Sequence, residues 1–327
     1  MSVPMDTTTP VIAAQGLTKR YGKATVVDSI AFDVARGEIF GLLGPNGAGK
    51  TTTILMMLGL TDVSEGTIRV LGHDPVREPL AVKRRVGYLP DQVGFYDNLS
   101  ATENLAYTAR LMGIAAAERP GRIAEALARV RLTDVARKRV STFSRGMRQR
   151  LGLAEILMKR AEIAILDEPT SGLDPQSTVE FLDMIRVLKQ EGVTVLLSSH
   201  LLDQVQRICD RVALFQTGRI VLIGAVPELA RKVLGAGFVV EVEADAPNDT
   251  DLAQRFSAVP GVTAVERVAA DRFRLTADRD VRPEAARAVV AANGALRRLS
   301  VDEPSLEAIY TRFFQDQADK PGVRHAA

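Results

Sequence analysis

The chain has 327 residues, which allows about two domains and ample hydrophobic core. Charged residues make up 25% of it and balance to a formal net charge of +2, so the composition does not indicate a general nucleic-acid binder. The single cysteine, Cys209, excludes an internal disulfide and fits a reducing compartment, and we interpret it as a small buried apolar residue.

We expect residues 1–10 to form an N-terminal tail, and their sequence MSVPMDTTTP lacks the basic and apolar regions of a secretory signal. The most apolar runs, residues 193–197 and 220–223, are as long as strands and much shorter than the roughly 18 residues of a membrane span. The sequence therefore predicts a chain that is soluble by itself. Any action on a membrane would need a second polypeptide.

Residues 11–36 are predicted to form short strands and turns, with Tyr21 in the polar turn KRYG. An exposed aromatic side chain in this turn can stack on an adenine ring. Packing is the commoner explanation for an isolated tyrosine in a turn, so both interpretations stay open from the residue alone.

A phosphate-binding loop is indicated by GPNGAGKT at residues 44–51, which fits the pattern GxxxxGK[ST] and follows the apolar run 39–43. Its three glycines let the backbone turn tightly and bring N–H groups close to phosphate oxygens. A helix is expected to begin at about Lys50, so a bound anion would also meet a helix N-terminus. Lys50 would add positive charge for the terminal phosphates, and the Thr51 hydroxyl would ligate Mg²⁺.

Two helices are predicted after this loop, within an insert over about residues 95–140. Ser100 and Glu103 form a capping box for the first, which continues through Met112. The second covers about residues 119–131, with apolar residues at helical spacing on one face. We interpret its arginine-rich opposite face as a solvated surface.

The segment FSRGMRQRLGLAEILMKR, residues 143–160, is predicted to be a further helix. Ser144 is a good N-cap, and Gly146 leaves the backbone open near the helix start, so a second helix N-terminus can face phosphate. The expected buried stripe consists of Leu151, Ala154, Leu157 and Met158.

An apolar strand at residues 163–166 then ends in Asp167 and Glu168, which is the Walker B pattern when it lies downstream of a P-loop. Asp167 would hold Mg²⁺, and Glu168 would orient or deprotonate the attacking water. A later buried strand, residues 193–197, leads into His200. At the carboxyl end of a strand beside the other phosphate-handling residues, His200 is well placed to contact a γ-phosphate.

In order and spacing, these segments resemble the ATP-binding cassette (ABC) ATPase family over about residues 11–230. GPNGAGKT is similar to Walker A, FSRGMRQR to the ABC signature, ILDEPTSGLD to Walker B joined to the D-loop, and LSSH to the H-loop. The resemblance implies a P-loop α/β core of ABC type with an antiparallel β subdomain and a helical subdomain. It also implies ATP and Mg²⁺ as cofactors, and it places the cassette at residues 11–234.

The resemblance gives each matching residue a role. Glu168 would be the catalytic base and His200 the γ-phosphate sensor, while Asp174 of the D-loop would act across a dimer interface. Two cassettes, this chain and a second copy or a related one, would sandwich two ATP molecules head to tail. The implied ATP-binding residues are Tyr21, Gly44, Pro45, Asn46, Gly47, Ala48, Gly49, Lys50, Thr51 and Thr52, and those implied to contact the opposite subunit's ATP are Ser144, Arg145, Gly146 and Met147.

The sequence departs from the family pattern at two motifs. The usual signature LSGGQ reads FSRGM at residues 143–147, so its first Gly and its Gln are missing, which weakens the contacts inferred for Arg145 and Met147. The Q-loop glutamine position holds Asp91, with Gln92 beside it. As an acid, Asp91 can approach Mg²⁺ together with Thr51 and Asp167, and Gln92 is the alternative.

These departures resemble a subset of cassettes that work with ABC-2 type permeases, commonly for export. Through GYLPDQVGFYDNLSATENL, the chain is also similar to the cassette that serves copper-site maturation of nitrous oxide reductase. We expect an ATPase subunit on the inner face of the cell membrane, with a groove between helical insert and core for a permease helix. The alternative is a soluble ABC ATPase acting on ribosomes or DNA. The single uninterrupted cassette and the lack of sustained heptads argue against this alternative.

The pattern changes after residue 234. Alternating and helical segments in the order βαββαβ, followed by a last helix, predict a small ferredoxin-like α+β domain over residues 238–316 and a flexible tail over 317–327. No metal spacing, nucleophile constellation or glycine-rich loop appears in it. We interpret it as a regulatory or dimer-supporting appendage, with ligand sensing as the alternative.

Overall fold

The computed structural model describes residues 9–234, 238–247, 251–302 and 305–318. The chain divides into two compact units, Met1–Ile223 and Gly224–Ala327. The predicted domain boundaries remain predictions, and they differ from this division in one element, α8 (Val226–Leu234), which lies in the second unit. Most of both predicted tails lies outside the described residues.

The larger sheet of the first unit has six strands in the order β5-β6-β7-β3-β8-β9. Its neighbours β6, β7 and β3 pair in parallel and are buried along their whole length. Parallel strands bring their carboxyl ends to one edge, so the loops that follow these three strands lie together there. The strands are β3 (Ile39–Leu43), β5 (Val86–Leu89), β6 (Ile163–Asp167), β7 (Thr194–Ser199), β8 (Arg211–Gln216) and β9 (Arg219–Gly224).

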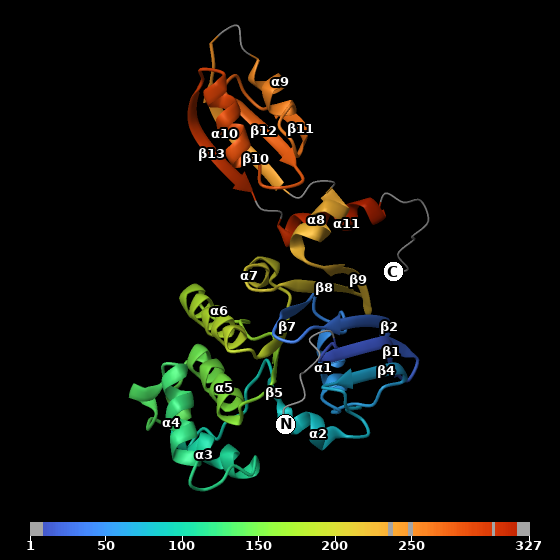
Figure 1. Cartoon of the computed structure of the whole chain (residues 1–327). Coiled ribbons are helices and arrows are strands. Elements are labelled where there is room, and N and C mark those ends of the chain that lie inside the picture. Colours follow the sequence, from blue (N-terminus) through green and yellow to red (C-terminus); the bar gives the residue numbers. More distant parts are fainter. Residues whose placement is uncertain (1–8, 235–237, 248–250, 303–304, 319–327) are drawn as a thin grey trace, which may run out of the picture. The chain divides into compact units, whose positions relative to one another are not determined.

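A second sheet, antiparallel and in the order β2-β1-β4, confirms the expected β subdomain (Figure 1). Its strands are longer than the short ones predicted, because register shifts absorb irregular residues without ending the pairing. One shift against β2 lies between Ala14 and Leu17, where Gly16 has a φ of 56°. The strands are β1 (Ile12–Tyr21), β2 (Ala24–Val34) and β4 (Glu65–Val70).

The helical subdomain contains α3 and α4, which pack on each other and on α5. α3 begins with the predicted capping box: Ser100 Oγ accepts from Glu103 N at 3.2 Å, and Glu103 Oε2 accepts from Ser100 N at 2.7 Å. No helix among the described residues is both long and apolar enough to cross a membrane. The helices of this unit are α1 (Lys50–Met57), α2 (Pro79–Arg85), α3 (Ala101–Leu111), α4 (Arg119–Arg129), α5 (Arg145–Lys159), α6 (Pro175–Gln190) and α7 (Leu202–Gln206).

α5 packs very closely on β5, through glycines on both elements. A Cβ built at Gly152 would lie 2.3 Å from Leu89 Cδ1, and one built at Gly87 would lie 2.7 Å from Ile156 Cγ2. Leu157, expected in the buried stripe, is only half-buried, whereas Ile156 is buried. The predicted residues Leu151, Ala154 and Met158 are buried as expected, and only Leu157 differs, because β5 covers the side of α5 on which Ile156 lies.

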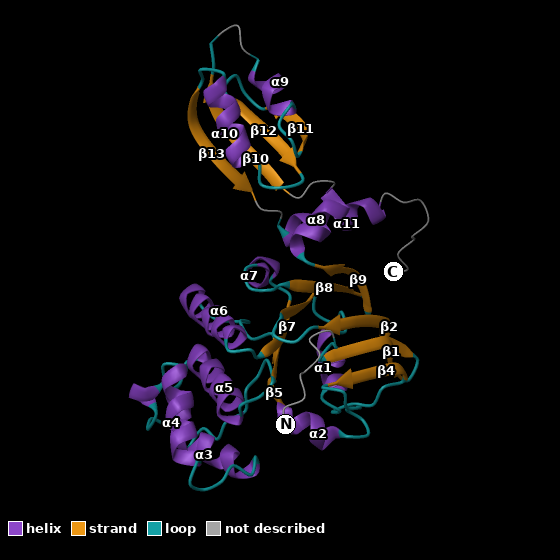
Figure 2. Cartoon of the chain, in the orientation of Figure 1, coloured by secondary structure: helices purple, strands orange, loops and turns teal. Residues whose placement is uncertain are grey.

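The second unit contains an antiparallel sheet in the order β11-β12-β10-β13, with α9 and α10 packed on it (Figure 2). This is the predicted βαββαβ ferredoxin-like arrangement. The last helix, α11 (Leu306–Ala318), packs against α8. The other elements are β10 (Phe238–Asp245), α9 (Leu252–Ser257), β11 (Val262–Arg267), β12 (Arg272–Ala277), α10 (Arg282–Ala291) and β13 (Ala295–Asp302).

Charged residues pair across the strands of this sheet at positions that alternate with its apolar core residues. Arg274 of β12 lies 3.4 Å from Glu241 of β10 and 3.5 Å from Glu266 of β11. Arg272 lies 3.6 Å from Glu243. Opposite charges on neighbouring strands stabilise a sheet modestly, and these pairs lie on the face of the sheet opposite its apolar core.

Gly59 follows α1 with a φ of 59°, and a Cβ built there would lie 2.1 Å from the carbonyl oxygen of Pro75. We expect Gly59→Ala to lower the free energy of unfolding by about 3 kcal/mol, because backbone strain and a backbone collision add. Gly72→Ala is the matched control. The φ of Gly72 is 82°, but an added Cβ meets nothing within 4 Å, so this variant should lose only about 1 kcal/mol of unfolding free energy. Urea unfolding followed by circular dichroism measures both, and equal losses would contradict the collision.

Candidate functional site

The P-loop connects β3 to α1 and lies against neighbouring backbone. Gly44 has a φ of 150°, and a Cβ built there would lie 2.4 Å from the carbonyl oxygen of Phe215, so glycine is required. As predicted, α1 begins at Lys50, directly after Gly49 in the left-handed conformation. Of the other predicted ATP-binding residues in this stretch, Pro45, Asn46, Gly47 and Thr51 are exposed, Thr52 is half-buried and Ala48 is buried.

The Lys50 side chain is buried and folds back over the P-loop. Its Nζ donates to the carbonyl oxygens of Gly44 at 2.7 Å and Pro45 at 3.1 Å. Glu168 Oε1 lies 3.3 Å from the same nitrogen. The ammonium group therefore joins the P-loop to the residue that follows β6.

Asp167, the last residue of β6, accepts two hydroxyl hydrogen bonds on one oxygen. Its Oδ1 accepts from Thr51 Oγ1 at 3.2 Å and from Ser198 Oγ at 2.5 Å. Burial raises the pKa of Asp167, while the hydrogen bonds from Ser198 and Thr51 act in the opposite direction. Sequence reasoning missed Ser198. Its only signal was a hydroxyl at the end of a buried strand.

Glu168 turns the chain sharply at the edge of the sheet, with a φ of 48°. Its N–H donates to Ser198 Oγ at 3.0 Å, and its Oε2 lies 2.8 Å from His200 Nδ1. Its Oε1 is buried and has no hydrogen bond among the described residues, although Lys50 is near. The structure thus brings Lys50, Thr51, Asp167, Glu168 and His200 together.

The predicted signature and D-loop residues form a separate group at the starts of α5 and α6. Ser144 caps α5 and accepts from Met147 N at 3.2 Å, and Asp174 caps α6 and accepts from Ser177 N at 2.9 Å. The bonds from Ser177 hold the pKa of Asp174 below its usual value. Gly146 is buried, and a Cβ built there would lie 3.2 Å from Ser177 Oγ.

The contacts of three further predicted residues, where the described chain has them, lie outside the group of Lys50, Thr51, Asp167, Glu168 and His200. Tyr21, at the end of β1, is half exposed, with its hydroxyl 3.4 Å from Thr61 Oγ1 and Lys19 Nζ 4.8 Å from its ring centre. Asp91 Oδ1 accepts from Arg145 Nη2 at 2.7 Å, and within the described chain Asp91 forms no hydrogen bond with Thr51 or Asp167. Gln92 is exposed.

Residues 27–171 match the ABC transporter family. The linearmycin resistance ATP-binding protein LnrL of Bacillus subtilis (strain 168) is 34% identical over 92% of this chain and 97% of its own length. The chain belongs to the ABC transporter family. This ABC protein is also 34% identical to the daunorubicin/doxorubicin resistance ATP-binding protein DrrA of Streptomyces peucetius, over 98% of this chain and 97% of that one.

Other comparisons agree with this family and with the predicted fold. A Nod factor export ATP-binding protein I of Ralstonia nicotianae is 39% identical over 72% of this ABC protein and 74% of its own length. A solved ATP binding subunit of an ABC transporter has a TM-score of 0.62 at 30% identity, covering 68% of this chain and 92% of that one. The narrower likeness to the copper-maturation cassette stays a prediction.

The pKa of Asp167 leads to a test of Ser198. A carboxyl whose pKa is higher in the folded than in the unfolded chain costs stability as the pH rises through that interval. Ser198→Ala removes the hydrogen bond that holds the pKa of Asp167 down. The variant should therefore lose about 2 kcal/mol of unfolding free energy at pH 7 and less at pH 4. Ser199→Ala is the control, because the Ser199 hydroxyl accepts from Leu201 N, and its loss should not depend on pH. Urea unfolding at both pH values decides, and a pH-independent loss for Ser198→Ala would contradict the assignment.

Proposed function

We propose that this ABC protein hydrolyses ATP to power a separate membrane permease of the ABC-2 type, in the direction of export. The observation that carries the proposal is the meeting of Lys50, Asp167, Glu168 and His200 at one edge of the parallel sheet. The names of its relatives, two for drug resistance and one for Nod factor export, support the transport part. The protein would act in the cytoplasm, attached to the inner face of the cell membrane through the permease.

ATP would bind with its phosphates over the P-loop, at the N-terminus of α1 and beside Lys50, and with its adenine on Tyr21. Mg²⁺ fits Thr51 and Asp167, whose facing oxygens come from two elements and lie 3.2 Å apart, since oxygen donors are those it prefers. The described residues contain no group of three or more His, Cys, Asp or Glu that could hold a metal. The remaining ligands would therefore come from the nucleotide and water. When bound, Mg²⁺ would neutralise negative charge on the ATP phosphates.

Glu168 is the proposed catalytic base. Its Oε2 is fixed by His200, and its Oε1 is buried without a hydrogen bond among the described residues. Lys50 Nζ lies 3.3 Å from this oxygen, and once the ATP phosphates engage Lys50, the carboxylate would accept a hydrogen bond from the attacking water and take its proton. With Nδ1 on Glu168, His200 would use its other ring nitrogen to contact the γ-phosphate.

A second cassette would complete each ATP site. Ser144, Arg145, Gly146 and Met147 lie at the start of α5, a helix N-terminus that favours phosphate. Asp174 lies in the same group, at the start of α6. We propose that these residues face the ATP of the opposite subunit, that ATP closes the dimer, and that hydrolysis reopens it.

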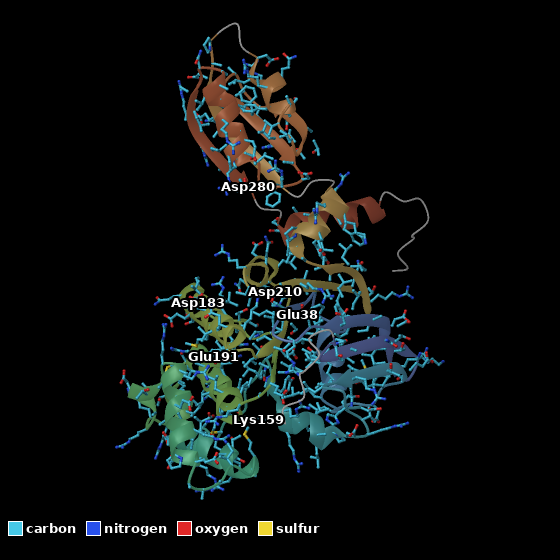
Figure 3. The ribbon with its side chains drawn as sticks, viewed as in Figure 1. Glu38, Lys159, Asp183, Glu191, Asp210 and Asp280 are labelled. Carbon is cyan, nitrogen blue, oxygen red and sulfur yellow. The ribbon has the colours of Figure 1, made fainter. Side chains whose placement is uncertain are left out.

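The permease would dock in a groove of about 310 Å³ between α5, the end of α3 and the segment after α1. Leu60 and Met112 line the groove, together with Lys159, which Figure 3 labels. The Leu60 side chain is 52% exposed. Exposed apolar side chains beside a groove are typical of protein contacts, here with an amphipathic helix.

The alternative, action on ribosomes or DNA, has no support from the relatives reported above, which are named for resistance or export. Recovery of the protein only in ribosomal or DNA fractions, and never with a membrane protein, would favour it.

Glu168→Gln tests the catalytic base. We expect it to bind ATP but to lose at least about 100-fold in steady-state hydrolysis, because general base catalysis contributes about that much or more. In saturating ATP it should accumulate as a dimer in size-exclusion chromatography. Glu125→Gln, at an exposed position on α4, is the control and should keep full activity. A mutant that hydrolyses ATP normally, or stays monomeric in ATP, would count against this role.

Leu60→Glu tests the docking groove, which the Leu60 side chain lines. A carboxylate at the exposed apolar edge should reduce copurification with the permease by about tenfold, since burying a charge there is costly. Val290→Glu, at a position 68% exposed on α10, is the matched control and should copurify as the wild type does. Equal recovery of both variants with the permease would place the docking surface elsewhere.

A further inference from the structure

Two positions that depart from the family pattern contact each other. Asp91, at the Q-loop glutamine position, follows β5, and Arg145 replaces the first glycine of the signature at the start of α5. Arg145 Nη2 lies 2.7 Å from Asp91 Oδ1. The Asp91 carboxylate, expected from the sequence beside Mg²⁺, is thus engaged by the signature segment of its own chain.

Neighbouring contacts hold the two segments in this arrangement. Gln149, buried in α5, donates from Nε2 to the Asp91 carbonyl oxygen at 3.1 Å. Arg148 Nη2 donates to Asp97 Oδ1 at 2.6 Å. One turn further along α5, Gly152 packs directly on the Leu89 side chain of β5. The backbone position of Asp91 relative to α5 is therefore fixed independently of its carboxylate.

Arg145 also lies against the D-loop. Arg145 Cζ lies 3.2 Å from the place where a Cβ at Gly172 would be, so the guanidinium passes over a residue without a side chain. Beside it, Gly146 faces Ser177 of α6, whose N–H is bound by Asp174. The Arg145 side chain, which belongs to the signature segment, therefore contacts both the segment after β5 and the D-loop.

We propose that Asp91 is a positioning residue that acts on ATP hydrolysis through Arg145. It holds Arg145 against the D-loop, and so orients the signature segment for the ATP of the opposite subunit, instead of ligating Mg²⁺. The inference rests on the dimer mechanism proposed above. Both side chains of the pair are about 45% exposed, so its contribution lies in orientation and its loss has a moderate effect.

The experiment compares the full chain with Asp91→Asn, Arg145→Gln and the double variant. Steady-state hydrolysis gives kcat and the KM for ATP. A second measurement, in the Glu168→Gln background, follows binding of the fluorescent analogue TNP-ATP as Mg²⁺ is titrated, and therefore needs no turnover. Asp97→Asn is the matched control, because it breaks the neighbouring pair with Arg148 between the same two segments and leaves Arg145 in place.

We expect each single variant to lower kcat about threefold to fivefold, the scale of an exposed ion pair, and the double variant to be no worse than the worse single. The Mg²⁺ concentration for half-maximal TNP-ATP binding should stay within about twofold of the wild-type value, and Asp97→Asn should lower kcat less than about twofold. Asp91→Glu should restore most of the activity by keeping a carboxylate near Arg145.

Two results would overturn the inference. A tenfold or larger rise in the Mg²⁺ requirement for Asp91→Asn alone, the scale of a lost metal contact, would make Asp91 a magnesium ligand. Multiplicative losses in the double variant would show that the two residues act independently. If the wild-type chain itself neither hydrolyses ATP nor dimerises, with or without its permease, the proposed function fails first and this inference fails with it.

Discussion

A single hydroxyl group, that of Ser198, connects the parts of the candidate site. Asp167 and Ser198 are register partners in the parallel pair β6 and β7, so the hydroxyl reaches the Asp167 carboxylate and the Glu168 N–H together. That double contact anchors the sharp turn at Glu168, and the turn directs its carboxylate between Lys50 and His200. A change in the pairing of these two strands would therefore separate the proposed metal ligand, base and sensor at once.

What the sequence predicted correctly depends on neighbours along the chain. The start of α1 at Lys50, the capping box at Ser100 and the N-cap at Ser144 are each specified by four or five consecutive residues. The family comparison confirms the cassette for the same reason, since its motifs are local. Local signals are the part of folding that a single sequence displays most directly.

What the sequence could not show depends on which distant segments meet. The contact of Asp91 with Arg145 joins positions 54 residues apart, and the role of Ser198 requires the register of β7 on β6. Gly87 and Gly152 are needed because α5 packs closely on β5, a contact between segments distant in the sequence. In the second unit, the sequence predicted the four strands, and the structure shows that they pair in the order β11-β12-β10-β13. The roles proposed for Tyr21 and the signature residues remain predictions.

The backbone of Glu168 has a consequence for variation at this position. A φ of 48° is comfortable for glycine or asparagine and strained for most other residues, at a cost of about 1 kcal/mol or more. Selection for folding alone would therefore replace this glutamate, and with it the carboxylate beside His200. The chain thus carries a locally unfavourable residue at the one position where its carboxylate lies between Lys50 and His200, which is the pattern expected where function outweighs local stability.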